Sequence, residues 1–399
     1  MTMVENKKEI YALQFYTLLT GIMQSVFRVV FNLYLRDIGT PNNIIGNITS
    51  ANLLGAAILG LIVSTTADVI GRKKVVMLAV IIFPLSSVLM LCVSDYTLIY
   101  LLSFIRGGFQ IVGFTVILSL LVSITGERNR VKYFGINFGL NMGSGVFGNL
   151  AGGILGDTFG LSQTMFLAML IFSLAIIPLS KIKVVDERKH IRNIFNFSGF
   201  NKNQKTLLLL HYSSTLAVGF GAGLFIHFGN LIFKDLFDMS TTSIGIALSI
   251  AQLGTAVGGI LAKKFGKKYG PFQFKFICQL MVVPLIISLA FVRDPFIFTI
   301  LYATRFVFMN IATPIMNSII NSYIPHDKIS TITGINSLIN NSIRSVAALL
   351  FGYIVGNSVD GYTTLFAISA VFYCVNSVIS FIMLKLYKND EAILNLFKH

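Results

Sequence analysis

The sequence predicts an all-α polytopic membrane protein made of two pseudo-symmetric bundles of six helices. Its 399 residues are 55% hydrophobic and only 12% charged, a balance typical of chains that cross a bilayer many times. Twelve apolar segments alternate with polar loops, and motifs of the first half return in the second. We therefore expect a first bundle over residues 1–181, a cytoplasmic linker over 182–205 and a second bundle over 206–399.

Each apolar segment is long enough to cross a bilayer as a helix. Backbone groups find no hydrogen-bond partner in hydrocarbon, and the sequence lacks the alternating pattern of barrel strands, so helices are expected. The expected spans run approximately over residues 10–35, 44–67, 75–93, 96–124, 133–155, 163–181, 206–233, 241–262, 272–292, 295–322, 331–356 and 363–384.

The basic residues set the predicted orientation. The formal net charge is +15, but Lys and Arg gather at the ends of apolar segments, which argues against a nucleic-acid-binding protein. With the N-terminus inside, only Arg36, Lys234 and Arg293 fall in outer loops. The positive-inside rule then places both termini in the cytoplasm.

Repeated motifs at nearly one spacing indicate an internal duplication. The matched pairs are residues 32–37 with 230–235, Arg106 with Arg305, and residues 135–137 with 334–336. They occur in the same order in both halves, which is the pattern expected of two duplicated six-helix bundles.

A charged loop follows the second span. Asp68 and Arg72 lie four residues apart, so they would face one side and pair if the helix continued past them. A carboxylate there can also accept hydrogen bonds from a neighbouring helix N-terminus. Such contacts at the cytoplasmic edge would hold one conformation and break in another. The alternative is an ordinary loop that carries the positive-inside charge.

The stretch Ala67-Asp68-x-x-Gly71-Arg72-Lys73-Lys74 resembles the signature loop of the major facilitator superfamily, and the resemblance covers essentially the whole chain. It departs from that pattern at Ser64, where Gly is usual, and at Val69, where Arg is usual. A second copy at 259–268 has Lys263 at the acidic position, so only the first copy can make the acidic contact. Residues 127–130 are similar to the charged loop that partners the signature. The conformational latch implied by the resemblance comprises Asp68, Gly71, Arg72, Glu127 and Arg130.

The fifth span is rich in glycine, which lets helices approach closely and slide. Residues 148–153, Gly-Asn-Leu-Ala-Gly-Gly, resemble the glycine-rich stretch of the exporters in this superfamily, with Asn149 where Pro is usual. The resemblance favours export, and plain helix packing is the alternative.

Four arginines fall inside predicted spans: Arg28, Arg106, Arg305 and Arg344. Each costs roughly 2.5–3.5 kcal/mol at the middle of a spanning helix. Together they would cost about 10–14 kcal/mol, so they should face a wet cavity or partners rather than lipid. The alternative for Arg106 and Arg305 is that they bind backbone carbonyls where helices cross.

Polar neighbours follow these arginines at helical spacing. Gln24, Arg28 and Asn32 form one stripe, as do Ser103, Arg106 and Gln110, and as do Asn336, Asn340 and Arg344. His227 falls within one residue of the position that matches Arg28. The resemblance implies that the first, fourth, seventh and tenth spans line the pathway. The predicted substrate-binding residues are Gln24, Arg28, Asn32, Arg106, Gln110, His227, Arg305 and Arg344.

All sixteen acidic residues fall in loops or at span ends. Superfamily exporters of lipophilic cations commonly keep a carboxylate within the membrane, and this chain lacks one. Guanidinium groups bind carboxylates and phosphates bidentately, so the stripes favour an anionic or zwitterionic substrate. The candidates for proton coupling are His227, Asp37 and Asp235, of which His227 has an ordinary pKa near physiological pH.

The sequence therefore predicts a secondary active transporter of a bacterial cell membrane, a monomer that works by alternating access. Proton-coupled export of a carboxylate-rich metallophore, an organic acid or an amphiphilic drug is favoured. Uptake of an anionic nutrient such as an organophosphate is the alternative within transport, and a non-transporting receptor or scaffold is the alternative class. Three isolated cysteines give no metal-binding cluster, no motif of an enzyme or cofactor site is found, and neither is expected.

Overall fold

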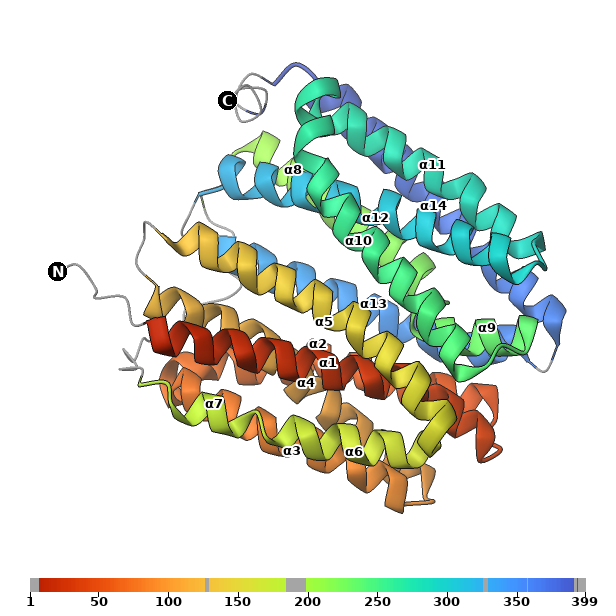
Figure 1. Ribbon diagram of the computed structural model, residues 1–399. Helices are drawn as coiled ribbons and strands as arrows, with labels where there is room; N and C mark the ends of the chain where they lie inside the picture. The colour runs from red at the N-terminus through yellow and green to blue at the C-terminus, as the bar shows by residue number, and fades with distance from the viewer. Residues whose placement is uncertain are drawn as a thin grey trace. The chain divides into compact units, whose positions relative to one another are not determined.

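The computed structural model describes residues 7–125, 129–183, 199–325, 329–356, 358–390 and 393, and every regular element within these ranges is a helix (Figure 1). The first half contains α1 (Lys7–Asp37), α2 (Asn42–Ile70), α3 (Arg72–Cys92), α4 (Tyr96–Ile124), α5 (Arg130–Phe159), α6 (Leu161–Ser173) and α7 (Ile176–Ser180). The second contains α8 (Lys202–Gly223), η2 (Ile226–Phe228), α9 (Gly229–Phe237), α10 (Thr241–Tyr269), α11 (Pro271–Phe291), α12 (Pro295–Tyr323), α13 (Ile329–Val355) and α14 (Val359–Tyr387). The all-α membrane fold predicted from the sequence is confirmed.

Two of the twelve predicted spans are interrupted. The sixth consists of α6 and the short α7, and the seventh is broken into α8, η2 and α9. Within the described residues, eleven stretches are long and apolar enough to cross a membrane. The predicted fifth span, α5, is not among them because its many glycines and asparagines lower its mean hydropathy.

The backbone contacts divide the chain into two compact units. The first unit comprises Met1–Arg192 with Asp238–Ser249, and the second comprises Asn193–Phe237 with Ile250–His399. The beginning of α10 therefore groups with the first unit, and the rest of that helix with the second. The predicted linker falls largely on residues 184–198, which lie outside the described ranges.

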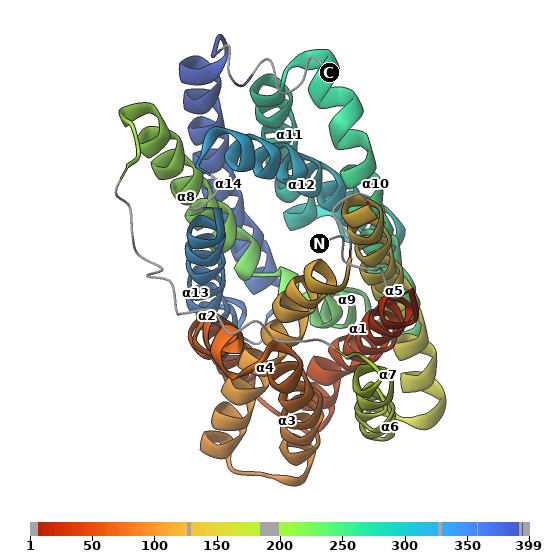
Figure 2. The same cartoon turned by 90° about the vertical axis from the view of Figure 1, so that its left-hand side faces the viewer.

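Equivalent helices pack in equivalent ways inside each unit. In the first unit α1 packs against α5, and α3 against α4 and α6. In the second unit α8 packs against α13, and α11 against α12 and α14, which lie beside it in both views (Figures 1 and 2). The two sets of contacts are the ones expected of duplicated bundles.

Side-chain contacts repeat with the same spacing. The Thr17 hydroxyl donates to the side-chain oxygen of Asn137 over 2.8 Å, and the Thr215 hydroxyl donates to that of Asn336 over 2.7 Å. Helices α2 and α4 approach so closely that a Cβ added to Gly55 would lie 1.8 Å from the Phe104 carbonyl oxygen. Helices α10 and α12 make the equivalent close approach at Gly254. Both pairs of helices touch through their backbones at these glycines, as small residues allow in membrane proteins.

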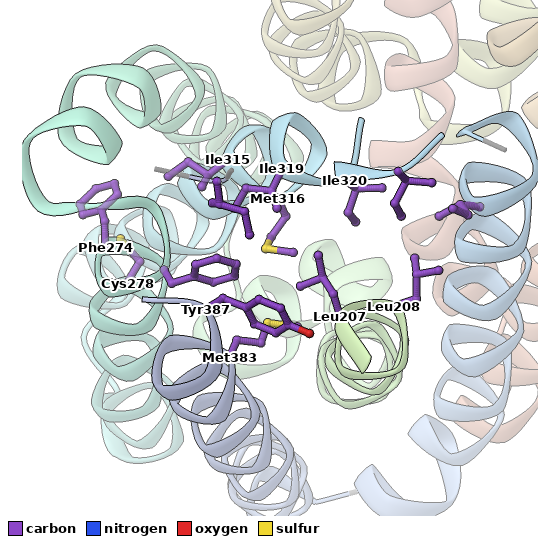
Figure 3. Close-up of a cluster of buried hydrophobic side chains, with 14 of the residues drawn as sticks. Leu207, Leu208, Phe274, Cys278, Ile315, Met316, Ile319, Ile320, Met383 and Tyr387 are labelled. Atoms are coloured by element: carbon purple, nitrogen blue, oxygen red, sulfur yellow. The ribbon is translucent and has the colours of Figure 1, made fainter. Parts of the chain in front are cut away.

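The helices of the second unit share a hydrophobic cluster near the start of α8 and α11 and the end of α12 and α14. Figure 3 shows side chains of α8, α11, α12 and α14 that point toward one another, among them Leu207, Cys278, Ile319, Met383 and Tyr387. Many large apolar side chains are instead exposed on the outer faces of the spans, for example Leu101, Leu170 and Val371. Such surfaces suit contact with lipid rather than with water.

Candidate functional site

Arg305 of α12 is enclosed by aromatic rings inside the second unit. Its side chain is only 1% exposed, and the guanidinium carbon lies 4.9 Å from the ring centroid of Phe225, 5.0 Å from Phe306 and 5.4 Å from Tyr373. One terminal nitrogen donates to the Tyr373 hydroxyl. The side chain is therefore held by cation–π contacts and a hydrogen bond, and the described residues give it no carboxylate partner.

Arg106 of α4, at the matching position, has the same surroundings in the first unit. Its guanidinium carbon lies 4.8 Å from the Phe27 ring centroid, 5.1 Å from Phe31 and 5.9 Å from Phe83. A desolvated cation–π contact contributes about 2 kcal/mol, so three rings offset the roughly 2.5–3.5 kcal/mol that an arginine costs in a span. In the described structure, the partners of these two arginines are rings rather than the backbone carbonyls of crossing helices.

Arg344 of α13 is half-buried and more available than Arg305. Its Nε donates to the side-chain oxygen of Asn340 over 3.1 Å. Among the described residues, nothing accepts from its terminal nitrogens. Arg344 also interacts electrostatically with Tyr373 and with Arg305, so the second unit brings two of the predicted arginines together.

His227 lies where the seventh predicted span is broken. Helix α8 ends at Gly223, and a single 3₁₀ turn, η2, carries His227 before α9 begins. A Cβ on Gly223 would lie 2.8 Å from both the Arg344 Cα and the Ala347 Cβ, so α8 reaches α13 through its backbone just before the break. Interrupted spans supply irregular backbone at the substrate sites of many transporters. Hydropathy predicts one continuous span over residues 206–233, and the sequence signal that could have indicated the break is the set of three glycines within Gly219–Gly223.

The other predicted binding residues lie on α1 and α4 of the first unit. Arg28 is exposed and donates to the Ser25 hydroxyl over 3.3 Å. Gln24 and Gln110 are half-buried, and Asn32 is buried. The predicted residues therefore divide into a group of five in the first unit, Gln24, Arg28, Asn32, Arg106 and Gln110, and a group of three in the second, His227, Arg305 and Arg344.

The latch loop departs from the sequence-based geometry. Helix α2 ends at Ile70, Gly71 has a φ of 115°, and α3 starts at Arg72. The helix does not continue from Asp68 to Arg72, so the condition on which the sequence-based pairing depended is not met. The pairing itself stays a prediction, because the Asp68 side chain lies outside the described part. Arg72 donates to the Ser119 carbonyl oxygen of α4 over 3.4 Å. The positive φ explains the need for glycine at position 71.

Lys73 also has a defined structural role beside this loop. Its ammonium donates to the carbonyl oxygens of Ser180 over 3.0 Å and Ile182 over 2.6 Å, at the C-terminal end of α7. A cation is favourable there because helix C-terminal carbonyls carry partial negative charge. Glu127 and the side chains of Asp68 and Arg130 lie outside the described part, so their predicted latch contacts stay predictions.

The carboxylate candidates for proton coupling lie at the ends of α1 and α9. Asp37 is exposed, whereas Asp235 is half-buried and accepts a hydrogen bond from the Tyr362 hydroxyl of α14. The two aspartates match in sequence but differ in surroundings.

An acidic contact between α5 and α10 was not predicted from the sequence. One oxygen of Asp157 accepts from the Thr241 amide over 3.0 Å, and the other accepts from the Thr242 amide over 2.7 Å, both within the first unit. Burial alone would raise the pKa of Asp157, but hydrogen bonds from Thr242 and Thr241 hold it below its usual value. A carboxylate at a helix N-terminus is also favoured by the helix dipole.

A buried polar cluster of the second unit was also missed. Lys275 of α11 is only 4% exposed, and no sequence pattern had singled it out. One turn further on, Gln279 accepts from Asn376 of α14, and Asn376 accepts from Ser214 of α8 over 2.6 Å. Hydropathy alone could not reveal which face of α11 points inward.

Comparison with known proteins identifies the family. The family model described as Major Facilitator Superfamily matches residues 13–348. The chain belongs to the major facilitator superfamily. This family consists of membrane transporters of small molecules, so the chain is a multi-pass membrane transporter.

Among superfamily relatives, the chain is 22% identical over 364 residues to the quinolone resistance protein NorA of Staphylococcus aureus (strain COL), covering 86% of this chain and 89% of that one. It is 23% identical over 408 residues to the multidrug resistance protein MdtG of Dickeya zeae (strain Ech586), covering 98% of both. The chain is therefore related to drug-efflux proteins of the superfamily.

Solved structures of superfamily transporters have the same fold. A bacterial homologue of the human lysosomal transporter Spinster, inward-facing and unoccupied, has a TM-score of 0.76 at 14% identity, covering 98% of this chain and 97% of that one. A D-xylose–proton symporter has a TM-score of 0.74 at 14% identity, covering 94% and 97%. At such identities the likeness concerns the fold alone.

Proposed function

We propose that this transporter exports a small anionic or zwitterionic compound across a bacterial cell membrane by alternating access, driven by the proton gradient. Both termini are placed in the cytoplasm by the basic loops, and the transporter works as a monomer. A carboxylate-rich metallophore, an organic acid or an amphiphilic drug would each fit. The latch residues around Asp68 would hold one conformation of the cycle and release it in the other.

The observation that carries the anion proposal is the setting of Arg344. Asn340 holds the guanidinium through Nε, which leaves the fork of terminal nitrogens for a ligand. A carboxylate or phosphate binds such a fork through two parallel hydrogen bonds. The described neighbours cannot neutralise it, because α13 contains no acidic residue and Arg305 close by is another cation.

Export is supported by two independent features. The glycine-rich α5 resembles the equivalent stretch of superfamily exporters, and the relatives include resistance proteins for quinolones and multiple drugs. Quinolones such as norfloxacin carry a carboxylate and an amine, so they are zwitterions of the proposed class. Uptake of an anionic nutrient such as an organophosphate is the second candidate, because a phosphate would fit the same guanidinium fork.

Transport by proteoliposomes tests the proposal. Norfloxacin should accumulate when the lumen is acidic, because an antiporter moves substrate against the flow of protons. Its ethyl ester, which lacks the carboxylate, should accumulate much less. Accumulation driven by an acidic exterior would instead establish symport and uptake. Binding without accumulation under either gradient would favour a receptor, and equal transport of the ester would contradict the anion proposal.

A further inference from the structure

Two apolar stripes lie side by side on the exposed surface of the first unit. The stripe on α3 contains Leu78, Ile81 and Leu85, and the stripe on α6 and α7 contains Leu170, Leu174 and Ile177. These six side chains recur every three or four residues, so each set follows one face of its span, and they are 47–57% exposed. Helix α3 packs against α6 and α7 (Figures 1 and 2), and the Phe83 ring centroid lies 4.9 Å from that of Phe172.

Each stripe continues into a lysine at the same end of the helix pair. Lys74 precedes Leu78 by four residues, and Lys181 follows Ile177 by four, so each lysine lies one turn beyond its stripe. Both lysines are exposed. A lysine in this position covers apolar surface with its methylene stem and extends its ammonium into the headgroup region of the membrane.

A pair of hydrogen bonds brings the two lysines together. The ammonium of Lys73, the neighbour of Lys74, donates to the carbonyl oxygens of Ser180 and Ile182, the residues on either side of Lys181. Consecutive Cα atoms are about 3.8 Å apart, so the two exposed lysines start directly beside this contact. Their ammonium groups can therefore reach one anion from two helices.

The helices that form this face do not neutralise its charge. Helices α3, α6 and α7 contain no acidic residue. Glu9, at the start of α1, which packs against α7, is only 8% exposed and does not lie on the surface. Lys183, two residues after Lys181, is exposed and adds a further positive charge.

The second unit has no equivalent pair. Gln273 is the third residue of α11, as Lys74 is the third residue of α3, and the one lysine of α11 is buried. Lys385 and Lys388 at the end of α14 are exposed, but α11 offers them no second cation, and Asp390 follows them with a negative charge. A lysine on each of two adjacent stripes is therefore a feature of the first unit.

We propose that this face binds an anionic phospholipid, with the phosphate between Lys74 and Lys181 and the acyl chains along the two stripes. The eleven residues from Lys74 to Leu85 span about 16 Å of helix, which matches one leaflet of a hydrocarbon core about 30 Å thick. Each lysine near the membrane surface favours an anionic over a zwitterionic lipid about fivefold. The inference concerns the lipid-facing surface and does not rest on the proposed substrate or direction of transport.

The chain contains no tryptophan, so a single introduced tryptophan reports on the lipid at one place. Ile81→Trp puts this reporter in the α3 stripe, where lipids with brominated acyl chains quench its fluorescence. Quenching in mixed bilayers of phosphatidylglycerol and phosphatidylcholine, with one of the two brominated, gives the relative binding constant of the two lipids. We expect phosphatidylglycerol to be favoured at least about fivefold. The preference should disappear when Lys74→Gln and Lys181→Gln are added.

Leu280→Trp is the matched reporter, because Leu280 holds the equivalent exposed position on α11, and it should show little preference. Lys385→Gln, added to Ile81→Trp, removes an exposed lysine elsewhere and should leave the preference unchanged. Leu170→Trp on α6 reports on the same face if Ile81→Trp does not fold. Equal binding of the two lipids at the first-unit reporters would overturn the proposal. So would a preference that survives the loss of both lysines, or one that is as strong at Leu280→Trp.

Discussion

Asn340 accepts a 3.1 Å hydrogen bond from Arg344, one turn later on α13, and thereby fixes the plane of the guanidinium. We expect Asn340→Ala to weaken norfloxacin binding about three- to tenfold, because a hydrogen bond of this kind contributes about 0.5–1.5 kcal/mol. Asn341→Ala is the control, since Asn341 bonds Ser337 instead. Equal affinity of the Asn340 and Asn341 variants, measured by calorimetry, would show that the guanidinium needs no such support.

The close approach of α8 and α13 makes Gly223 sensitive to any side chain. A Cβ there would lie 2.8 Å from Arg344 Cα, so Gly223→Ala should destabilise the purified protein by about 1–3 kcal/mol, as overpacking does. Gly259→Ala on α10 has open space around the new Cβ and should not destabilise it. Thermal unfolding in detergent measures the stability of both variants. Similar midpoints for Gly223→Ala and Gly259→Ala would mean that α8 and α13 move apart without loss of stability.

The Asp157 contact predicts a pH dependence with a defined sign. Hydrogen bonds hold the pKa of Asp157 below the ordinary value of 3.8, so this group stabilises the fold above that pH. The stabilisation is lost as the pH falls through the depressed value in the folded protein. The melting temperature of the wild type should therefore exceed that of Asp157→Asn at pH 7, and the gap should close below about pH 4. A gap that does not change with pH would rule out this role for the carboxylate.

The signature loop should control the rate of conformational change rather than affinity. We expect Asp68→Asn to slow norfloxacin transport strongly while its equilibrium binding changes little, since a latch acts on the equilibrium between conformations. Lys385→Gln, at an exposed position of α14, serves as the control. Normal turnover of Asp68→Asn in proteoliposomes would remove the proposed role of this residue.

The sequence predicted the spans well because hydropathy over about 20 residues reflects the thickness of a bilayer. The repeat was also visible, and the contacts of Thr17 and Thr215 show why: each half keeps the same hydrogen bond to an asparagine. Local breaks were harder to predict. The turn at His227 interrupts a helix inside an apolar run, where hydropathy does not change, whereas the break at Gly71 falls in the charged loop that the sequence places after the second span.

The surroundings of polar side chains could not be read from periodicity. Arg106 and Arg305 were expected to need water or partners, and the partners are aromatic rings supplied by helices distant in sequence. The burial of Lys275 was not predicted, because hydropathy gives its position along α11 but not the direction of its side chain. The contact of Asp157 was not predicted because its partners are backbone amides, which every residue type except proline can supply.

We propose that Arg344 binds the negative charge of the substrate, and equilibrium binding by the purified protein measures this contact. Norfloxacin should bind more tightly than its ethyl ester or tetraphenylphosphonium. Arg344→Ala should weaken norfloxacin binding at least about tenfold, because a hydrogen bond to a charged group contributes about 1.5–3 kcal/mol. Arg344→Lys should weaken it less, since it keeps the charge but loses the fork. The control is Arg293→Ala, at an exposed loop arginine that bonds Thr363, and it should bind as the wild type does. Tighter binding of tetraphenylphosphonium, or wild-type affinity in Arg344→Ala, would contradict the claim.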